Sequence, residues 1–166
     1  MNLGKGPGGT KRYHIEVVSP SQTTPILDQL RASDLTGSAL RRMAMSLLSS
    51  LDTYCWSGVY LLEGDELVLD EYVGEPTDHV RIPVGRGVCG TAVAERSNQV
   101  IEDVRSLSNY LACSIKTRSE LVVLIYAADG SILGQIDIDG HEVGAFDSSD
   151  EAFLADVAAI LAERWT

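Results

Sequence analysis

Apolar residues recur at helical spacing near both ends of the chain. Between 38 and 51 they repeat every three or four positions, which predicts a helix with one buried face; these residues are Leu40, Met43, Leu47, Leu48 and Leu51. A shorter helix is predicted over 24–32. The polar run Ser148–Glu151 is typical of a capping box and predicts a third helix over 149–163.

The middle of the chain favours strands. Alternating or short apolar runs bounded by turn residues predict strands over 56–62, 66–73, 79–83, 98–102, 119–126 and 132–139, with a short helix over 91–96. Helices at both ends of a mostly antiparallel sheet indicate an α+β domain. We expect residues 1–12 to be a disordered N-terminus, 13–37 an extension with a short helix, and 38–166 the domain proper.

The strongest hairpin signal is Asp129-Gly130, read as a two-residue turn. That turn sets Glu120 opposite Asp139 and Val122 opposite Asp137. Because side chains alternate along a strand, Glu120, Asp137 and Asp139 then share one face. The other face is apolar and is the natural seat for the terminal helices; it carries Leu121, Val123, Ile125, Ile132, Ile136 and Ile138.

Like charges placed opposite one another destabilise a sheet, so the three acids need an explanation. Water screens them if they lie exposed at the open end of the hairpin. Alternatively, they bind a cationic group or share a proton. Two close carboxyl groups cannot easily both ionise, and a neutral acid then becomes available near pH 7. Three acids around one pocket suit a zwitterionic amino-acid ligand.

Two of the three cysteines are candidates for chemistry. The run Gly85-x-Gly87-x-x-Gly90 matches a dinucleotide fingerprint but lacks the parallel βαβ setting, so we interpret it as the loop that brings Cys89 to a helix N-terminus, where a thiol pKa is lowered. Cys113 precedes Glu120 by seven residues, with Lys116 and Arg118 between them. It is a nucleophile or a buried filler. Cys55 is predicted to lie in the core.

Composition narrows the function classes. The chain has 166 residues and a net charge of −11, which argues against binding to nucleic acid or to an anionic membrane surface. The sequence contains no apolar run long enough to cross a bilayer and no signal peptide, so the cytoplasm is the expected location. The cysteines form no CxxC pair and the three histidines do not cluster with them, which predicts free thiols and no metal site.

An ordered set of motifs resembles the free methionine-(R)-sulfoxide reductases, a GAF-domain family. The motifs are Gly85–Ala92, Glu102–Val104, Ala112-Cys113, Ser119–Val123 and Gly134–Asp139. The resemblance implies a six-stranded antiparallel sheet with helices on one face and a small ligand pocket on the other. It assigns the nucleophile to Cys113, the pocket carboxylates to Glu120, Asp137 and Asp139, and an aromatic wall to Trp56 and Tyr60.

The same resemblance implies a reaction that needs no metal or organic cofactor. Free methionine sulfoxide is held by its ammonium group, a neutral acid protonates its oxygen, and the Cys113 thiolate attacks sulfur. Cys113 becomes a sulfenic acid, which a second thiol converts to a disulfide for a thioredoxin-like or small-thiol reductant. His79 stands where the family commonly has its resolving cysteine, which leaves Cys89 or an external thiol for that step. The alternative function is a non-catalytic GAF module that binds a small molecule and forms a homodimer through its terminal helices.

Overall fold

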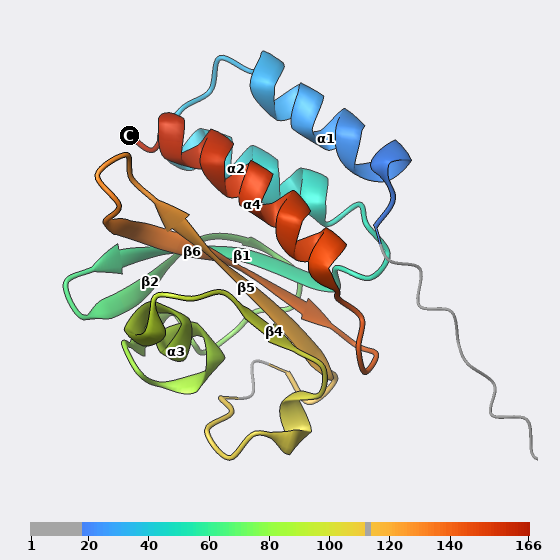
Figure 1. Cartoon of the computed structure of the whole chain (residues 1–166), viewed down its shortest axis with the longest axis vertical. Helices are drawn as coiled ribbons and strands as arrows, with labels where there is room; N and C mark the ends of the chain where they lie inside the picture. Colours follow the sequence, from blue (N-terminus) through green and yellow to red (C-terminus); the bar gives the residue numbers. More distant parts are fainter. Residues whose placement is uncertain (1–17, 112–113) are drawn as a thin grey trace, which may run out of the picture.

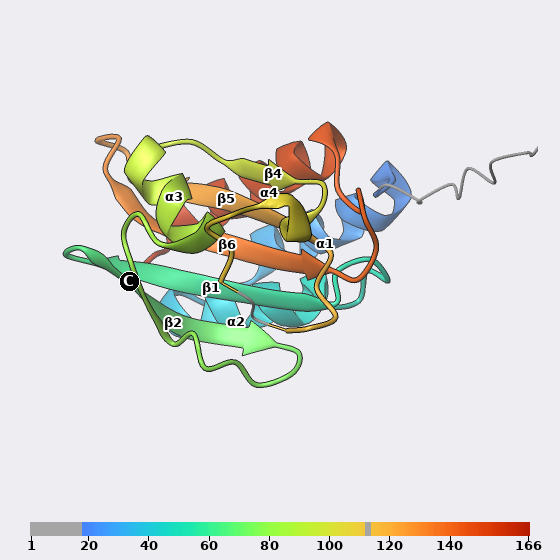
Figure 2. The ribbon, with the colours of Figure 1, turned by 90° about the horizontal axis from the view of Figure 1, so that it is seen from below.

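Two helices cover one face of a six-stranded sheet, a third packs on the outer side of those two, and a fourth lies on the other face of the sheet (Figures 1 and 2). The computed structural model describes residues 18–111 and 114–166. The covering helices are α2 (Gly37–Leu48) and α4 (Ser148–Glu163), and α1 (Pro20–Ala32) packs on them; α3 (Gly87–Glu95) lies on the opposite face. This arrangement confirms the predicted α+β class. The expected disordered segment 1–12 lies outside the described residues.

The sheet has the strand order β3-β2-β1-β6-β5-β4, and every neighbouring pair is antiparallel. Its strands are β1 (Trp56–Glu63), β2 (Glu66–Val73), β3 (Arg81–Pro83), β4 (Gln99–Ile101), β5 (Ser119–Tyr126) and β6 (Ile132–Gly140). A single 3-10 turn, η1 (Val104–Ser106), follows β4. The two most buried strands, β5 and β6, therefore lie inside the sheet, between β1 and β4.

Two apolar clusters lie on the two faces of the sheet. The larger packs α2 and α4 against the sheet and α1 against these two helices, and Leu30, Leu40 and Leu154 are fully buried in it. The smaller lies under α3 and includes Trp56 and Tyr60. Helix α1, which belongs to the predicted extension 13–37, contributes to the same core as the rest of the domain. Both terminal helices thus fix the orientation of the sheet.

The cap of α4 differs from the prediction by one residue. Asp147, rather than Ser148, is the N-cap: its carboxylate accepts hydrogen bonds from the amides of Ser149 at 2.7 Å and Asp150 at 3.4 Å. Asp150 completes the capping box by accepting from the Asp147 amide at 3.0 Å. A carboxylate at this position also interacts favourably with the positive end of the helix dipole, which the Ser148 hydroxyl cannot do.

The β5–β6 hairpin has the predicted register, but its turn differs from the predicted one. The turn has three residues rather than two, because the Ala127 amide donates to the Ser131 carbonyl and Gly130 has a φ of 82°. A bulge then shifts the pairing by one residue between Tyr126 and Ile125, which restores the register toward the open end. One prediction fails as a result: Ile132 packs against the smaller cluster under α3, while Leu133 packs against the helices.

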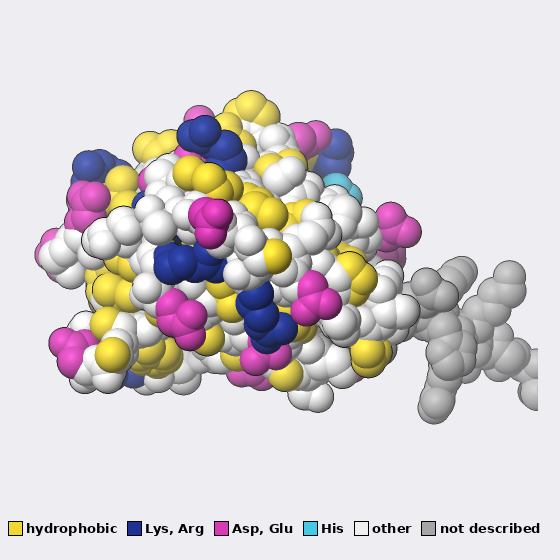
Figure 3. All heavy atoms as spheres, turned by 90° about the horizontal axis from the view of Figure 1, so that it is seen from above, with side chains coloured by type: hydrophobic (Ala, Val, Ile, Leu, Met, Phe, Trp, Pro, Cys, Tyr) yellow, Lys and Arg dark blue, Asp and Glu magenta, His cyan; other side chains and the backbone are white. Residues whose placement is uncertain are grey.

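Charged side chains are dispersed over the helical surface. Seen from above, Lys and Arg side chains are interspersed with Asp and Glu and do not gather into a patch of one sign (Figure 3). Within residues 18–111 and 114–166, no helix combines the length and apolar composition that a bilayer span requires.

Candidate functional site

Three carboxyl groups converge on the face of the sheet that α3 covers. Glu120 on β5 pairs with Asp139 on β6, and Asp137 pairs with Val122, as the sequence predicts. The exposed fractions of Glu120, Asp137 and Asp139 are 3%, 0% and 2%. The alternative in which water screens these acids is therefore wrong. Burying like charges side by side is costly, so the arrangement indicates a binding or catalytic site.

Burial raises the pKa of all three acids. It raises the pKa of Asp137 to about 7. The pKa of Glu120 lies well above its usual range because of burial first, and then because of the charges of Asp137 and Asp139. Burial and the charge of Asp137 raise the pKa of Asp139, while the Thr117 hydroxyl partly opposes the shift. At neutral pH the cluster therefore holds at least one neutral acid, which can donate a proton.

Cys89 lies directly against these acids. It is the third residue of α3, is 4% exposed, and its Sγ lies 3.9 Å from Oε1 of Glu120, to which the thiol donates. Because this hydrogen bond favours the charged form of Glu120, it offsets a small part of the burial effect on the Glu120 pKa. The glycine loop thus does deliver Cys89 to the first turn of a helix, as predicted.

A cavity of about 360 Å³ opens beside Asp139. Its lining residues are Cys55, Trp56, Gly74, Glu75, Ser114, Thr117, Asp139 and His141. Oδ1 of Asp139 is buried and has no hydrogen-bond partner among the described residues. An unpaired carboxylate oxygen at the edge of a cavity is suited to accept a hydrogen bond from a cationic ligand group.

Trp56 forms an aromatic wall of this cavity. Its indole Nε1 donates to the Glu75 carbonyl at 3.1 Å, and its ring stacks on Tyr72 with centroids 5.7 Å apart. The ring also lies over Gly58, where a Cβ atom would come within 2.2 Å of Cη2. Tyr60, the other predicted wall residue, is fully buried in the smaller cluster, donates to the His79 carbonyl at 2.9 Å, and is not among the residues lining the cavity.

The predicted nucleophile, Cys113, lies outside the described residues. Its neighbour Ser114 lines the cavity. Cys55, predicted to lie in the core, is only partly buried and also lines the cavity. Sequence reasoning missed Cys55, Glu75 and His141 because all three lie outside the helices and strands, where hydrophobic periodicity carries no signal.

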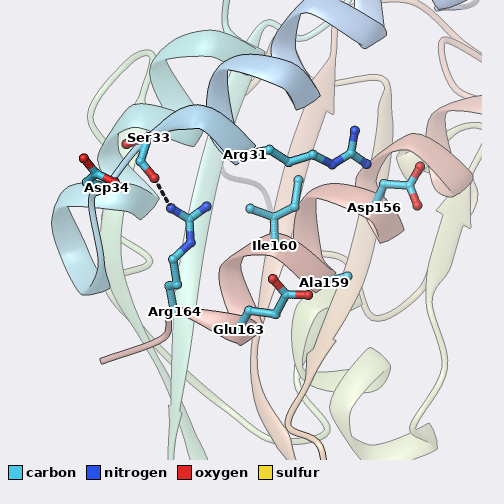
Figure 4. Close-up of a pocket in the computed structure, with 8 residues that line it drawn as sticks. All are labelled: Arg31, Ser33, Asp34, Asp156, Ala159, Ile160, Glu163 and Arg164. Atoms are coloured by element: carbon cyan, nitrogen blue, oxygen red, sulfur yellow. Dashed lines mark hydrogen bonds between the residues drawn. The ribbon is translucent and has the colours of Figure 1, made fainter.

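A larger hollow of about 620 Å³ lies on the opposite side of the sheet, between α1 and α4 (Figure 4). Its lining residues are Arg31, Ser33, Asp34, Asp156, Ala159, Ile160, Glu163 and Arg164. The guanidinium of Arg164 donates to the carbonyls of Leu30 and Ser33, so it holds the C-terminal end of α4 to α1. With no thiol in its lining, this hollow lacks the groups for redox chemistry.

Known proteins resemble this chain in sequence and in fold. The sequence pattern of the GAF domain matches residues 30–163. The free methionine-R-sulfoxide reductase of Escherichia coli is 46% identical over 106 residues, which cover 64% of this chain and 63% of that protein. The chain thus spans less than two thirds of the length of that relative.

Two solved structures resemble the whole fold. The free methionine-R-sulfoxide reductase of Neisseria meningitidis, solved in complex with its substrate, superimposes with a TM-score of 0.78 at 33% identity and covers 86% of this chain and 85% of its own. A GAF sensor protein from Burkholderia vietnamiensis gives a TM-score of 0.81 at 33% identity and covers 87% of this chain and 93% of its own. The fold is therefore shared by a reductase and by a protein whose name assigns it to the GAF sensors.

Proposed function

This chain belongs to the GAF domain family, and we propose that it reduces free methionine-(R)-sulfoxide to methionine with Cys113 as the nucleophile. The observation that carries the proposal is the buried Oδ1 of Asp139, which has no hydrogen-bond partner among the described residues and lies at the edge of a cavity walled by Trp56. The likeness to the E. coli and N. meningitidis reductases supports the choice of substrate.

Asp139 and Trp56 are proposed to bind the substrate. Free methionine sulfoxide carries an ammonium group, which Asp139 holds through a charge-assisted hydrogen bond that also compensates the burial of the carboxylate. Asp137 lies two residues before Asp139 on β6 and adds negative charge on the same face of the sheet. The Trp56 ring covers the apolar part of the side chain. A ligand without a free amino group gains none of the ammonium interaction, which favours the free amino acid.

Glu120 is proposed to supply the proton for the chemical step. Its neutral form is favoured by burial and by the two aspartates beside it. As the Cys113 thiolate attacks the sulfoxide sulfur, Glu120 protonates the departing oxygen. The substrate gains two electrons and leaves as methionine, while the oxygen is transferred to Cys113, which becomes a sulfenic acid.

A second thiol is needed to complete the cycle. Attack of a thiol on the Cys113 sulfenic acid forms a disulfide and releases water. Cys89 is the candidate within the chain, and for this role its thiol must leave Glu120. An external thiol is the other candidate, because His79 occupies the position of the resolving cysteine expected from the resemblance. A thioredoxin-like protein or small thiol then returns both sulfurs to the reduced state.

The test is to measure methionine released from free methionine-(R)-sulfoxide in the presence of dithiothreitol. We expect steady turnover by the wild-type chain and none by Cys113→Ser, with unchanged thermal melting showing that the variant is folded. Turnover by Cys113→Ser would exclude Cys113 as the nucleophile. No methionine from a folded, reduced wild-type chain would exclude the reductase function.

The second candidate function is binding of a small molecule without chemistry. The likeness to the Burkholderia vietnamiensis sensor favours it. In that function the terminal helices, predicted to mediate a homodimer, would transmit the signal. Native mass spectrometry distinguishes the two: a sensor retains its ligand unchanged, whereas a reductase incubated with sulfoxide and reductant releases methionine.

A further inference from the structure

Cys89, Glu120 and Asp137 together have the geometry of a metal-binding site. One ligand atom from each residue lies within 4.8 Å of the corresponding atoms of the other two. A tetrahedral zinc ion, with Zn–S near 2.3 Å and Zn–O near 2.0 Å, holds its ligands about 3.5 Å apart. The measured Cys89 Sγ to Glu120 Oε1 distance of 3.9 Å is close to that value. Binding an ion therefore requires the three ligand atoms to move closer, from within 4.8 Å of one another to about 3.5 Å.

No backbone amide, lysine or arginine among the described residues donates to Asp137, which independently favours a cation. Asp137 is fully buried, yet neither of its carboxylate oxygens has a hydrogen-bond partner among the described residues. A fully buried carboxylate without a partner is costly, so a bound cation would satisfy it. Every ion pair between side chains 18–111 and 114–166 involves other residues, so no lysine or arginine neutralises this cluster.

The donor set selects the class of ion. One thiolate and two carboxylates match the borderline-soft zinc class, which takes mixed sulfur and oxygen ligands. Magnesium and calcium need six or more oxygen ligands and do not favour sulfur. Three protein ligands also leave a fourth coordination position for water.

We propose that Cys89, Glu120 and Asp137 bind a zinc-class divalent cation and that this ion inhibits the protein. A bound ion coordinates Glu120, which then cannot donate its proton. The ion also places positive charge beside Asp137, two residues from Asp139 on β6. The inhibitory part rests on the proposed function, because Glu120 is its proton donor and Asp139 its ammonium-binding residue. Binding of the ion itself does not depend on that function.

The test is anaerobic titration of the reduced, chelator-treated full chain with Co²⁺, followed by displacement with Zn²⁺. We expect one Co²⁺ per chain, with a thiolate-to-cobalt charge-transfer band in the near ultraviolet. Cys89→Ser should lose the band, and Asp137→Asn should bind about tenfold or more weakly while keeping it. Cys113→Ser is the matched control and should keep both the band and the affinity.

Several results would overturn the site. These are the absence of a thiolate band at stoichiometric Co²⁺, a band that survives Cys89→Ser, or one that disappears in Cys113→Ser. Should Cys89→Ser fail to fold, as judged by its thermal melt, unchanged affinity of Asp137→Asn would overturn the site in its place.

Inhibition is tested separately in the methionine assay with a monothiol reductant at low concentration. Zn²⁺ should raise the apparent KM for methionine sulfoxide in the wild type, and Mg²⁺ should not. Zn²⁺ binding without any change in KM would overturn the inhibitory role but not the site. Cobalt binding by a chain that releases no methionine would overturn the proposed reaction while leaving the site in place.

Discussion

Glu120 and Asp139 lie directly opposite one another in the β5–β6 ladder, and both carboxyl groups are buried. A sheet gains nothing in stability from such a pair, since like charges at opposed positions repel and burial removes the water that would screen them. We infer that stability is given up here for a pocket that combines an anionic group with a neutral acid.

Asp137→Asn should stabilise the protein at pH 8. Burial raises the Asp137 pKa from 3.8 to about 7, so the folded chain keeps a proton there that the unfolded chain releases above a pH of about 4. Its contribution to the free energy of unfolding therefore falls as the pH rises through that window, at about 1.4 kcal/mol per pKa unit. Urea denaturation of metal-free protein should show that the free energy of unfolding decreases less between pH 5.5 and pH 8 in the variant than in the wild type. A variant less stable than wild type at pH 8 would contradict this.

Asp139→Asn and Glu120→Gln should impair different kinetic constants. Loss of the carboxylate at Asp139 removes the partner of the substrate ammonium, a loss of about 2 kcal/mol or more, and should mainly raise KM. Glutamine at position 120 cannot donate a proton and should mainly lower kcat, by about a hundredfold or more. Steady-state methionine release measures both. Equal effects of the two variants on KM alone would refute the assignment of Glu120 as the acid.

Substrate should protect Cys55 from alkylation. Cys55 and Asp139 line the same cavity, and burial raises the pKa of the Cys55 thiol, so iodoacetamide should label it slowly at pH 7 and faster at higher pH. Saturating methionine-(R)-sulfoxide should slow the labelling further. Peptide mass spectrometry on Cys113→Ser, which avoids turnover, gives the rate. A rate that does not change with substrate would place the ligand elsewhere; buried Cys89 is the internal control, labelled only after unfolding.

Gly58→Ala should displace the Trp56 indole. The added Cβ would meet Cη2 at 2.2 Å, so the ring must move, at a cost of about 1–3 kcal/mol. Tryptophan emission and thermal melting report the change. Gly64→Ala is the matched control: its φ of 65° imposes backbone strain, but no atom lies within 4 Å. Emission changes of equal size in the two variants would mean that Gly58 does not position Trp56.

The register of the hairpin was predictable because polar and apolar residues alternate strictly in β6 from Gln135 to Asp139. Leu121 and Ile138 face the helices, and Glu120 and Asp139 face away, so only one pairing satisfies the core. The turn was not predictable in detail. The three-residue loop and the bulge shift the pairing in opposite directions, so the register beyond the bulge is the predicted one. Only the face on which Ile132 lies differs from the prediction.

The burial of the acids was not predictable from sequence. The same pattern fits an exposed hairpin end or a covered pocket, and the choice depends on α3 packing its first turn against Glu120. The far wall of the cavity comes from irregular segments carrying Glu75, Ser114 and His141, whose positions depend on tertiary contacts. The anionic face thus follows from the local sequence pattern of the strands, whereas the cavity depends on tertiary contacts.

The most direct test of the account is the fate of the two sulfoxide epimers. Free methionine sulfoxide is supplied as an equal mixture of R and S forms with dithiothreitol, and chiral chromatography follows each epimer and methionine. A pocket that fixes the ammonium group and the sulfoxide oxygen at once predicts that the R form disappears, that methionine appears in equal amount, and that the S form remains. Persistence of both epimers, or their equal consumption, would contradict the account.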